Sequence, residues 1–144
     1  MIYTDKTKRA IKLCYEAHAG QVDKSGLPYV HHPLHLAEQM HDENTTIVAL
    51  LHDVVEDTDY TIEDLEAMDF GPDVIKAIRL MTHDDSVPYM DYVREIAKNP
   101  IAREVKLADL AHNSDLTRLD HEPTESDLIR LEKYRKAKEI LTEI

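Results

Sequence analysis

Apolar and polar residues follow the period of an α-helix along most of this chain. The clearest case is residues 47–61, IVALLHDVVEDTDYT, where apolar side chains recur at i, i+3, i+4, i+7 and i+8. In a helix those side chains form one buried stripe, made of Ile47, Leu50, Leu51, Val54 and Val55. The opposite face then carries four polar groups within about one turn, namely His52, Asp53, Glu56 and Asp57.

The carboxylates on that face are unusually crowded, because like charges at this spacing repel one another. An ordinary solvated face would intersperse Lys or Arg, but residues 47–61 contain neither. A bound cation would remove the repulsion, and histidine with aspartate is a good ligand set for a divalent transition metal. The alternative is an acidic helix face that only contacts water. The pattern favours the metal site and leaves this alternative open.

The remaining pattern predicts an all-α fold of about seven to eight helices. Besides the central helix, helices are expected at residues 4–19, 33–41, 61–68, 72–82, 89–98 and 100–119, and from Thr124 or Ser126 to the C-terminus. Threonines supply caps, and prolines suit the first turns. The segment QVDKSGLPYVHHP reads as a loop because of its Ser-Gly and Pro content. Strand-like alternation is hard to find, and glycines number only 3.

Length and charge narrow the class of protein. A chain of 144 residues is expected to form one domain, 1–144, with a core of its own. The net charge of −12 argues against binding to nucleic acid or to an anionic membrane. No apolar run approaches the roughly 20 residues of a membrane span, and the N-terminus lacks the apolar core of a signal peptide. The single cysteine, Cys14, fits a reducing cytosol, so we expect a cytoplasmic protein. Its oligomeric state is left open.

Two further positions stand out as candidates for chemistry. His32 lies just before Pro33, where a loop enters a helix. Asp109 lies in the otherwise apolar stretch VKLADLAHN, and a buried carboxylate needs a partner. That partner is either a metal ion or a hydrogen-bonding group.

With these positions, the order His32, His52-Asp53, Asp109 resembles the HD superfamily of metal-dependent phosphohydrolases. The stretches HAGQVDKSGLPYVHHP, LLHDVVEDTDYT and VKLADLAHN resemble the hydrolase domain of the RelA/SpoT homologues and the small alarmone hydrolases. The similarity covers roughly residues 5 to 120. Members of that family remove the 3′-diphosphate from guanosine tetra- and pentaphosphate, ppGpp and pppGpp. The resemblance implies a compact HD-domain helical bundle and hydrolysis of a nucleotide phosphoester or diphosphate ester by metal-activated water.

The resemblance also implies roles for individual residues. One divalent ion, manganese by analogy, would be bound by His32, His52, Asp53 and Asp109. The pair Glu56 and Asp57 would position the attacking water and handle protons, or alternatively give electrostatic support to the metal. Lys24, Ser25, Tyr29 and Asn113 would contact a small-molecule nucleotide substrate.

Some of these roles have alternatives within the chain. His31 and His35 compete with His32 for the first ligand position, but His32 has the matching place before Pro33. Lys24 has a solvated surface position as its alternative. His112, beside Asn113, is expected to be structural.

Three positions depart from the alarmone hydrolases and leave the exact substrate open. Asp23 and Leu110 stand where those enzymes usually carry arginine, and Asp115 stands where basic residues are common. An aspartate cannot stack on a purine as a cation does, and it repels phosphate. The alternatives are therefore an HD phosphohydrolase for another 3′-phosphorylated or 5′-nucleotide, or a catalytically weak metal- and nucleotide-binding module. The intact Glu56–Asp57 pair argues against a module that only binds nucleotide. Because 144 residues are too few for the family's synthetase domain as well, we expect no alarmone synthesis from this chain.

Overall fold

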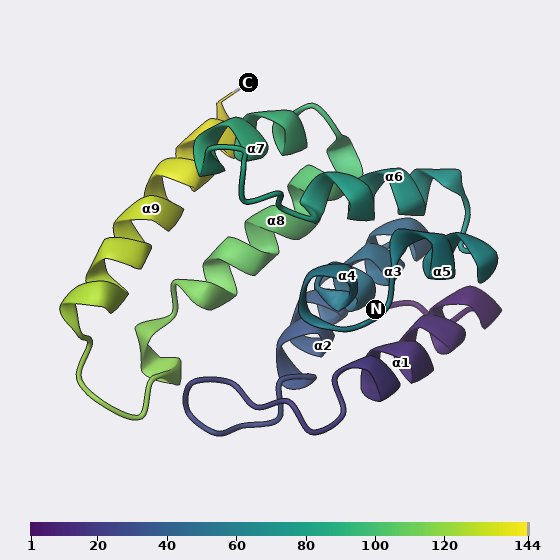
Figure 1. Cartoon of the computed structure of the whole chain (residues 1–144), viewed down its shortest axis with the longest axis horizontal. Coiled ribbons are helices and arrows are strands. Elements are labelled where there is room, and N and C mark those ends of the chain that lie inside the picture. The colour runs from purple at the N-terminus through teal and green to yellow at the C-terminus, as the bar shows by residue number, and fades with distance from the viewer. Residues whose placement is uncertain (144) are drawn as a thin grey trace.

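A computed structural model describes residues 1–143 and confirms the all-α prediction. This part of the chain contains nine α-helices and one short 3₁₀ helix, and it has no strand beyond a single bridge between Val22 and Pro28. The elements are α1 (Asp5–Ala17), α2 (His31–Glu38), α3 (Glu43–Leu51), α4 (Val54–Asp57), α5 (Ile62–Ala67), α6 (Pro72–Met81), α7 (Tyr89–Ala97), α8 (Pro100–Asn113), η1 (Leu116–Arg118) and α9 (Glu125–Thr142) (Figure 1).

Helix α3 is the centre of the core, where it packs against α1, α2, α6 and α8. Ile47, Leu50 and Leu51 are fully buried, as their spacing predicts. Val48 and Ala49, on the other side of the helix, are buried as well. Residues 47–51 of α3 are therefore apolar on every side, and the neighbouring helices cover them.

The central stretch is two helices, so the prediction of one helix over residues 47–61 is wrong. Helix α3 ends at Leu51, the chain turns at His52 and Asp53, and α4 begins at Val54. His52 Nδ1 donates to the carbonyl oxygen of Ala49 at 2.7 Å. A side chain that takes a nearby backbone carbonyl competes with the helical ladder, which accounts for a break at this point. The turn separates the two candidate ligands from the acidic pair that follows them.

The predicted caps are present at three helix starts. Thr4, Thr61 and Thr124 each accept a hydrogen bond from the backbone N–H three residues later, and each forms a reciprocal capping box. Helix α2 begins at His31, two residues before the predicted start at Pro33. This places His32 inside the first turn of α2.

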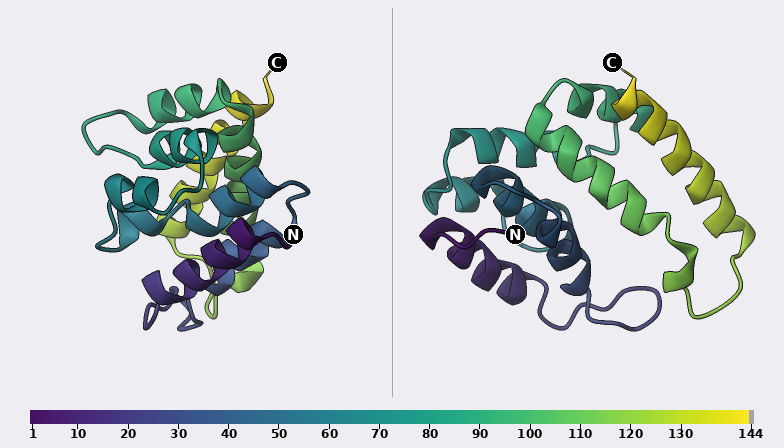
Figure 2. Two further views of the ribbon diagram at one scale, coloured as in Figure 1. Left: turned by 90° about the vertical axis from the view of Figure 1, so that its right-hand side faces the viewer. Right: turned by 180° about the vertical axis from the view of Figure 1, so that it is seen from behind.

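Helix α8 ends earlier than predicted, at Asn113 instead of Leu119. The Asp115 side chain accepts from the backbone N–H of Thr117 at 3.0 Å and starts η1. Helix α9 then returns along α8 and also packs on α7 (Figures 1 and 2). Within residues 1–143 no helix has the length and apolar character needed to cross a membrane.

Candidate metal centre and adjoining pocket

Two histidines and two aspartates from three parts of the chain meet in the interior. Ligand atoms of His32, His52 and Asp109 all lie within 4.8 Å of one another. Asp109 Oδ1 is 2.9 Å from His32 Nε2 and 3.5 Å from His52 Nε2. Asp53 Oδ2 completes the group at 3.1 Å from His52 Nε2 and 4.0 Å from His32 Nε2. The four residues predicted from sequence as ligands are thus brought together by α2, the α3–α4 turn and α8.

The chemistry of His52 fits a bound cation. Its Nδ1 proton is committed to the Ala49 carbonyl, so Nε2 is the nitrogen that faces the two carboxylates. Nε2 is buried and has no hydrogen-bond partner. Burial would lower the pKa of His52, but Asp53 and Asp109 outweigh burial and raise it well above its ordinary value. The two carboxylates therefore favour a positive charge at His52 Nε2. Either a proton or a bound divalent ion can supply that charge.

Asp109 is held by a neighbour that the sequence analysis did not single out. The Lys106 ammonium donates to Asp109 Oδ2 at 3.0 Å, and Asn113 Nδ2 donates to Oδ1 at 3.0 Å. Burial raises the pKa of Asp109, but Lys106 and the two histidines outweigh burial and hold it well below the ordinary range. The sequence does hold a signal for Lys106, because a lysine one helical turn before a buried acid lies on the same helix face and can pair with it.

Tyr29 contacts the His–Asp cluster and also lines the adjoining pocket. Its hydroxyl donates to Asp53 Oδ2, which orients that carboxylate. Burial and the nearby Asp53 charge raise the pKa of Tyr29, so the phenol keeps its proton. Sequence reasoning placed Tyr29 among the nucleotide contacts and missed this hydrogen bond, because residues 29 and 53 are distant in the chain.

The acidic pair Glu56 and Asp57 divides into two environments. Asp57 lines a pocket beside the His–Asp cluster, and its backbone carbonyl accepts a hydrogen bond from Gln21 Nε2 at 2.9 Å. Glu56 turns toward the α6–α7 loop, where its carboxylate accepts from the backbone N–H of His83. Burial raises the pKa of both carboxyl groups, and the Asp53 charge adds to the effect.

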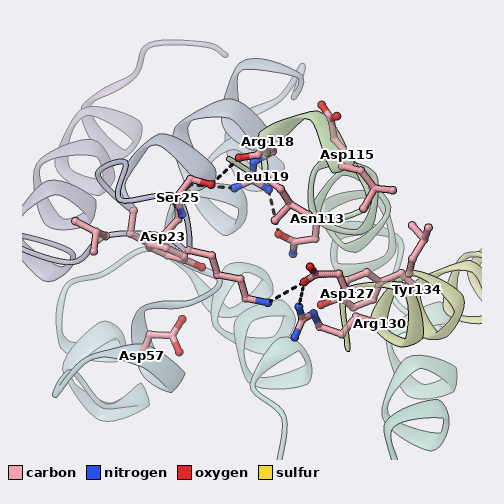
Figure 3. A pocket seen from close by; sticks show the side chains of 15 residues that line it. Asp23, Ser25, Asp57, Asn113, Asp115, Arg118, Leu119, Asp127, Arg130 and Tyr134 are labelled. Carbon is pink, nitrogen blue, oxygen red and sulfur yellow. Dashed lines mark hydrogen bonds and ion pairs between the residues drawn. The ribbon is translucent and has the colours of Figure 1, made fainter. Parts of the chain in front are cut away.

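The pocket has a volume of about 610 Å³ and lies between the α1–α2 loop, the end of α8, η1 and α9 (Figure 3). All four residues predicted to contact the substrate line it, namely Lys24, Ser25, Tyr29 and Asn113. Arg118, Arg130 and Tyr134 line it too, and sequence reasoning missed them. Arg118 comes from η1, whereas Arg130 and Tyr134 come from α9, which carries no recognisable motif and reaches the pocket through its packing on α8.

Residues that depart from the family pattern have clear structural partners. Asp23 Oδ1 accepts from the backbone N–H groups of Ser25 and Leu27 at 2.9 and 3.0 Å. Its Oδ2 lies 3.8 Å from Arg118 Nη2. Asp23 therefore organises its own loop and pairs with a pocket cation. Leu110 is buried in the core and does not line this pocket.

The other two histidines of α2 lie outside the His–Asp cluster. His31 and His35 are exposed, whereas His32 is 3% exposed. His112, which was expected to be structural, is buried with its Nδ1 2.7 Å from His32 Nδ1. Burial and the nearby Arg118 lower the pKa of His112 to about 3, so its imidazole is neutral.

The fold and the His–Asp cluster define the class of protein. The sequence matches the family model described as HD domain over residues 10–136, and the chain belongs to that family. MESH1 of zebrafish (Danio rerio), named guanosine-3′,5′-bis(diphosphate) 3′-pyrophosphohydrolase, is 37% identical over 122 residues. That match covers 75% of this chain and 67% of MESH1.

Bacterial relatives and a solved structure agree with this assignment. The bifunctional (p)ppGpp synthase/hydrolase SpoT of Escherichia coli K12 is 33% identical over 75% of this chain and 17% of SpoT. A GTP pyrophosphokinase of Streptomyces coelicolor is 40% identical over 74% of this chain and 14% of that protein. The chain thus spans a small fraction of these bacterial proteins. A structure described as a metazoan SpoT ortholog that hydrolyzes ppGpp superposes with a TM-score of 0.74 at 29% identity, covering 99% of this chain and 86% of that one.

Proposed function

We propose that this chain is a metal-dependent phosphohydrolase that removes the 3′-diphosphate from guanosine nucleotides of the ppGpp type. One observation carries the proposal: the His–Asp cluster adjoins a pocket of nucleotide size, with Tyr29 and Asn113 belonging to both. The names of MESH1 and SpoT supply the substrate class. We propose a cytoplasmic setting, which the unpaired, buried thiol of Cys14 supports.

The proposed cofactor is one divalent ion, with Mn²⁺ as the first choice. His32, His52, Asp53 and Asp109 would hold it, since all four turn a nitrogen or carboxylate oxygen toward one another. Such an ion supplies Lewis acidity, which polarises a phosphoryl oxygen and activates water. The surrounding residues restrict how the ligands turn. Tyr29 orients Asp53, and Lys106 with Asn113 orients Asp109.

Asp57 is the proposed group for proton transfer. It faces the pocket, and its raised pKa brings it nearer to the pH at which a carboxylate exchanges protons efficiently. Gln21 holds the Asp57 backbone, so its position depends on the α1–α2 loop. Glu56 contributes negative charge beside the cluster and ties α4 to the α6–α7 loop. We assign Glu56 a positioning role and Asp57 the contact with the reacting groups.

The pocket supplies cations for a phosphorylated ligand. Lys24, Arg118 and Arg130 all line it, and Tyr134 adds an aromatic ring suited to a base. Each cation already has an acidic partner. Arg118 faces Asp23, and Arg130 faces Asp127 (Figure 3). Lys24 also faces Asp127, at 4.0 Å. Phosphate groups would have to compete with these carboxylates for the cations.

This competition supports a second candidate function. The acidic pocket residues Asp23, Asp115 and Asp127 favour a nucleotide with fewer phosphates than ppGpp, such as another 3′-phosphorylated or 5′-nucleotide. The reaction and the metal site would be the same. Only the charge of the accepted substrate would differ.

The test is release of phosphate and pyrophosphate from a nucleotide panel in the presence of Mn²⁺. The panel contains ppGpp, pppGpp, 3′-phosphorylated nucleotides and 5′-nucleotides. We expect pyrophosphate from ppGpp with the native protein, and none with Asp53→Ala, which lacks a metal ligand. Release of phosphate from the smaller nucleotides alone would favour the second candidate. Nucleotide binding without turnover of any compound would contradict both and indicate a binding module.

A further inference from the structure

His32 and His112 meet through their Nδ1 atoms. The two nitrogens are 2.7 Å apart, the ring planes differ by 4°, and the ring centroids are 4.9 Å apart. Parallel rings whose centroids are so much farther apart than their nitrogens lie edge to edge in a common plane. The nitrogens therefore face each other along their lone-pair directions, which is the geometry of a hydrogen bond. Both side chains are buried.

Only one proton fits between these nitrogens, so two arrangements are possible. In the first, His32 Nδ1–H donates to His112, and His32 Nε2 is free to present a lone pair to an ion. In the second, His112 donates, and neutral His32 must carry its proton on Nε2, which faces Asp109 Oδ1 at 2.9 Å. A proton on Nε2 excludes coordination through that atom.

We propose that His112 is a positioning residue that accepts the His32 Nδ1 proton and so holds His32 with Nε2 directed at the metal site. This inference rests on the proposed metal centre and extends it beyond the four ligands. His112 then carries its own proton on Nε2 and acts through His32 without contact with the ion. The two ligand histidines are thereby anchored alike, since His52 Nδ1 donates to the Ala49 carbonyl.

His112 is itself held in place from two sides. Arg118 Nη1 donates to the His112 backbone carbonyl at 2.9 Å, and the His35 ring lies against the His112 ring with centroids 4.1 Å apart. Because Arg118 also lines the pocket, the pocket wall and the ligand anchor share one residue. His41 is exposed and has neither a hydrogen bond nor a ring contact with His32 or His112, which makes it a matched control.

The first experiment reads the proton positions directly. Zn²⁺ serves as a diamagnetic probe, and long-range ¹H–¹⁵N spectra of the imidazole rings distinguish protonated from unprotonated nitrogens. In the zinc-loaded native protein we expect protonated His32 Nδ1 and His112 Nε2, and unprotonated His112 Nδ1. An unprotonated His32 Nδ1 would overturn the proposal.

The second experiment measures Zn²⁺ and Mn²⁺ affinity by calorimetry on three variants. His112→Leu leaves the buried Nδ1–H of His32 without an acceptor and should weaken binding by about 10- to 100-fold. His112→Asn places an amide oxygen near the position of Nδ1 and should recover most of the loss. His41→Ala should bind both ions as the native protein does. Thermal melts confirm that each variant is folded.

The outcomes separate this inference from the proposed activity. Native affinity in folded His112→Leu would overturn the positioning role. A native protein that binds neither ion would overturn the metal site and this inference together. Tight binding with the expected proton positions, but no nucleotide hydrolysis, would overturn only the proposed activity.

Discussion

The Lys106 ammonium lies 3.0 Å from Asp109 Oδ2, one helical turn before it on α8, and leaves Oδ1 to face the histidines. Both residues are buried, and Lys106 also lies over the rings of Tyr89 and Tyr92. Burial lowers the pKa of Lys106, but Asp109 and the tyrosines outweigh burial and raise it well above its ordinary value. The pair therefore stays charged, and it fixes which oxygen of Asp109 is available to an ion.

Removing the lysine is expected to destabilise the metal-free protein strongly. Lys106→Met leaves the Asp109 charge buried without its partner, which typically costs about 3–5 kcal/mol. Saturating Mn²⁺ should restore more stability to this variant than to the native protein, because the ion replaces the missing positive charge. Urea melts with and without Mn²⁺ measure both effects.

An exposed ion pair is the control for this prediction. Lys98 lies 2.9 Å from Glu95 with both side chains mostly exposed, so Lys98→Met should change stability by less than about 1 kcal/mol. Equal losses of stability in Lys106→Met and Lys98→Met would mean that burying the Lys106–Asp109 pair adds nothing to the free energy of unfolding.

The two residues of the acidic pair should differ in their effect on rate. Asp57→Asn removes the pocket-facing carboxylate and should lower kcat by about 10²- to 10⁴-fold with metal content unchanged. Glu56→Gln keeps an oxygen that can accept from His83 N–H, so its loss should be smaller. Steady-state kinetics together with elemental analysis test this assignment. A larger loss in Glu56→Gln would reverse the two roles, and metal loss in either variant would make that residue part of the ion site.

Protonation of Asp57 should affect activity and, in the metal-free protein, stability. As the pH falls, activity should decline as the Asp57 carboxylate takes up a proton, because the active form is the carboxylate. In the metal-free fold, burial and the Asp53 charge raise the pKa of Asp57 above its ordinary value of 3.8. The folded metal-free state binds this proton more tightly than the unfolded chain does. Asp57 therefore stabilises the fold as the pH falls and destabilises it as the pH rises through the pKa window. Asp57→Asn should remove the contribution of this carboxyl group to the pH–rate profile and to the pH dependence of the melting temperature. Unchanged profiles would exclude Asp57 as the titrating group.

Asp23 should limit the binding of highly charged nucleotides. Asp23→Asn retains an oxygen for the N–H groups of Ser25 and Leu27 but removes the charge beside Arg118. We expect KM for ppGpp to fall by about three- to tenfold at low salt and by less at high salt. Asp23→Arg is a poorer test, because arginine cannot accept those backbone hydrogen bonds and the loop would lose its anchor.

The control for Asp23 is Asp120→Asn, the same change at an exposed residue outside the pocket. Kinetics at two ionic strengths distinguish a local effect from a change in net charge. Equal KM changes in the two variants would show that only net charge matters.

The core position of α3 gives a stability prediction. Leu51 is fully buried, so Leu51→Ala should cost about 2–5 kcal/mol through lost burial and a residual cavity. Leu128 is 51% exposed on α9, and Leu128→Ala should change stability by less than about 0.5 kcal/mol. Denaturant melts decide the matter, and similar values for the two leucines would contradict the central place of α3.

Local sequence was enough to predict the helical class, the main helix starts and the four residues that cluster in the interior. Helical period and capping are local properties, so Thr4, Thr61 and Thr124 could be recognised as caps from neighbouring residues alone. His32, His52, Asp53 and Asp109 were recognisable because their order along the chain resembles a known family. The structure then brought all four to one place.

The surroundings of that cluster depend on how the helices pack against one another. The helix breaks at His52, where the imidazole hydrogen-bonds to the Ala49 carbonyl in competition with the helical backbone. Hydrophobic periodicity does not predict such a hydrogen bond. The contacts Tyr29–Asp53 and His32–His112 join residues that are far apart in the chain, and α9 brings Arg130 to the pocket in the same way. A residue's type shows what it can bind, but its partner depends on packing between helices, which local sequence does not encode.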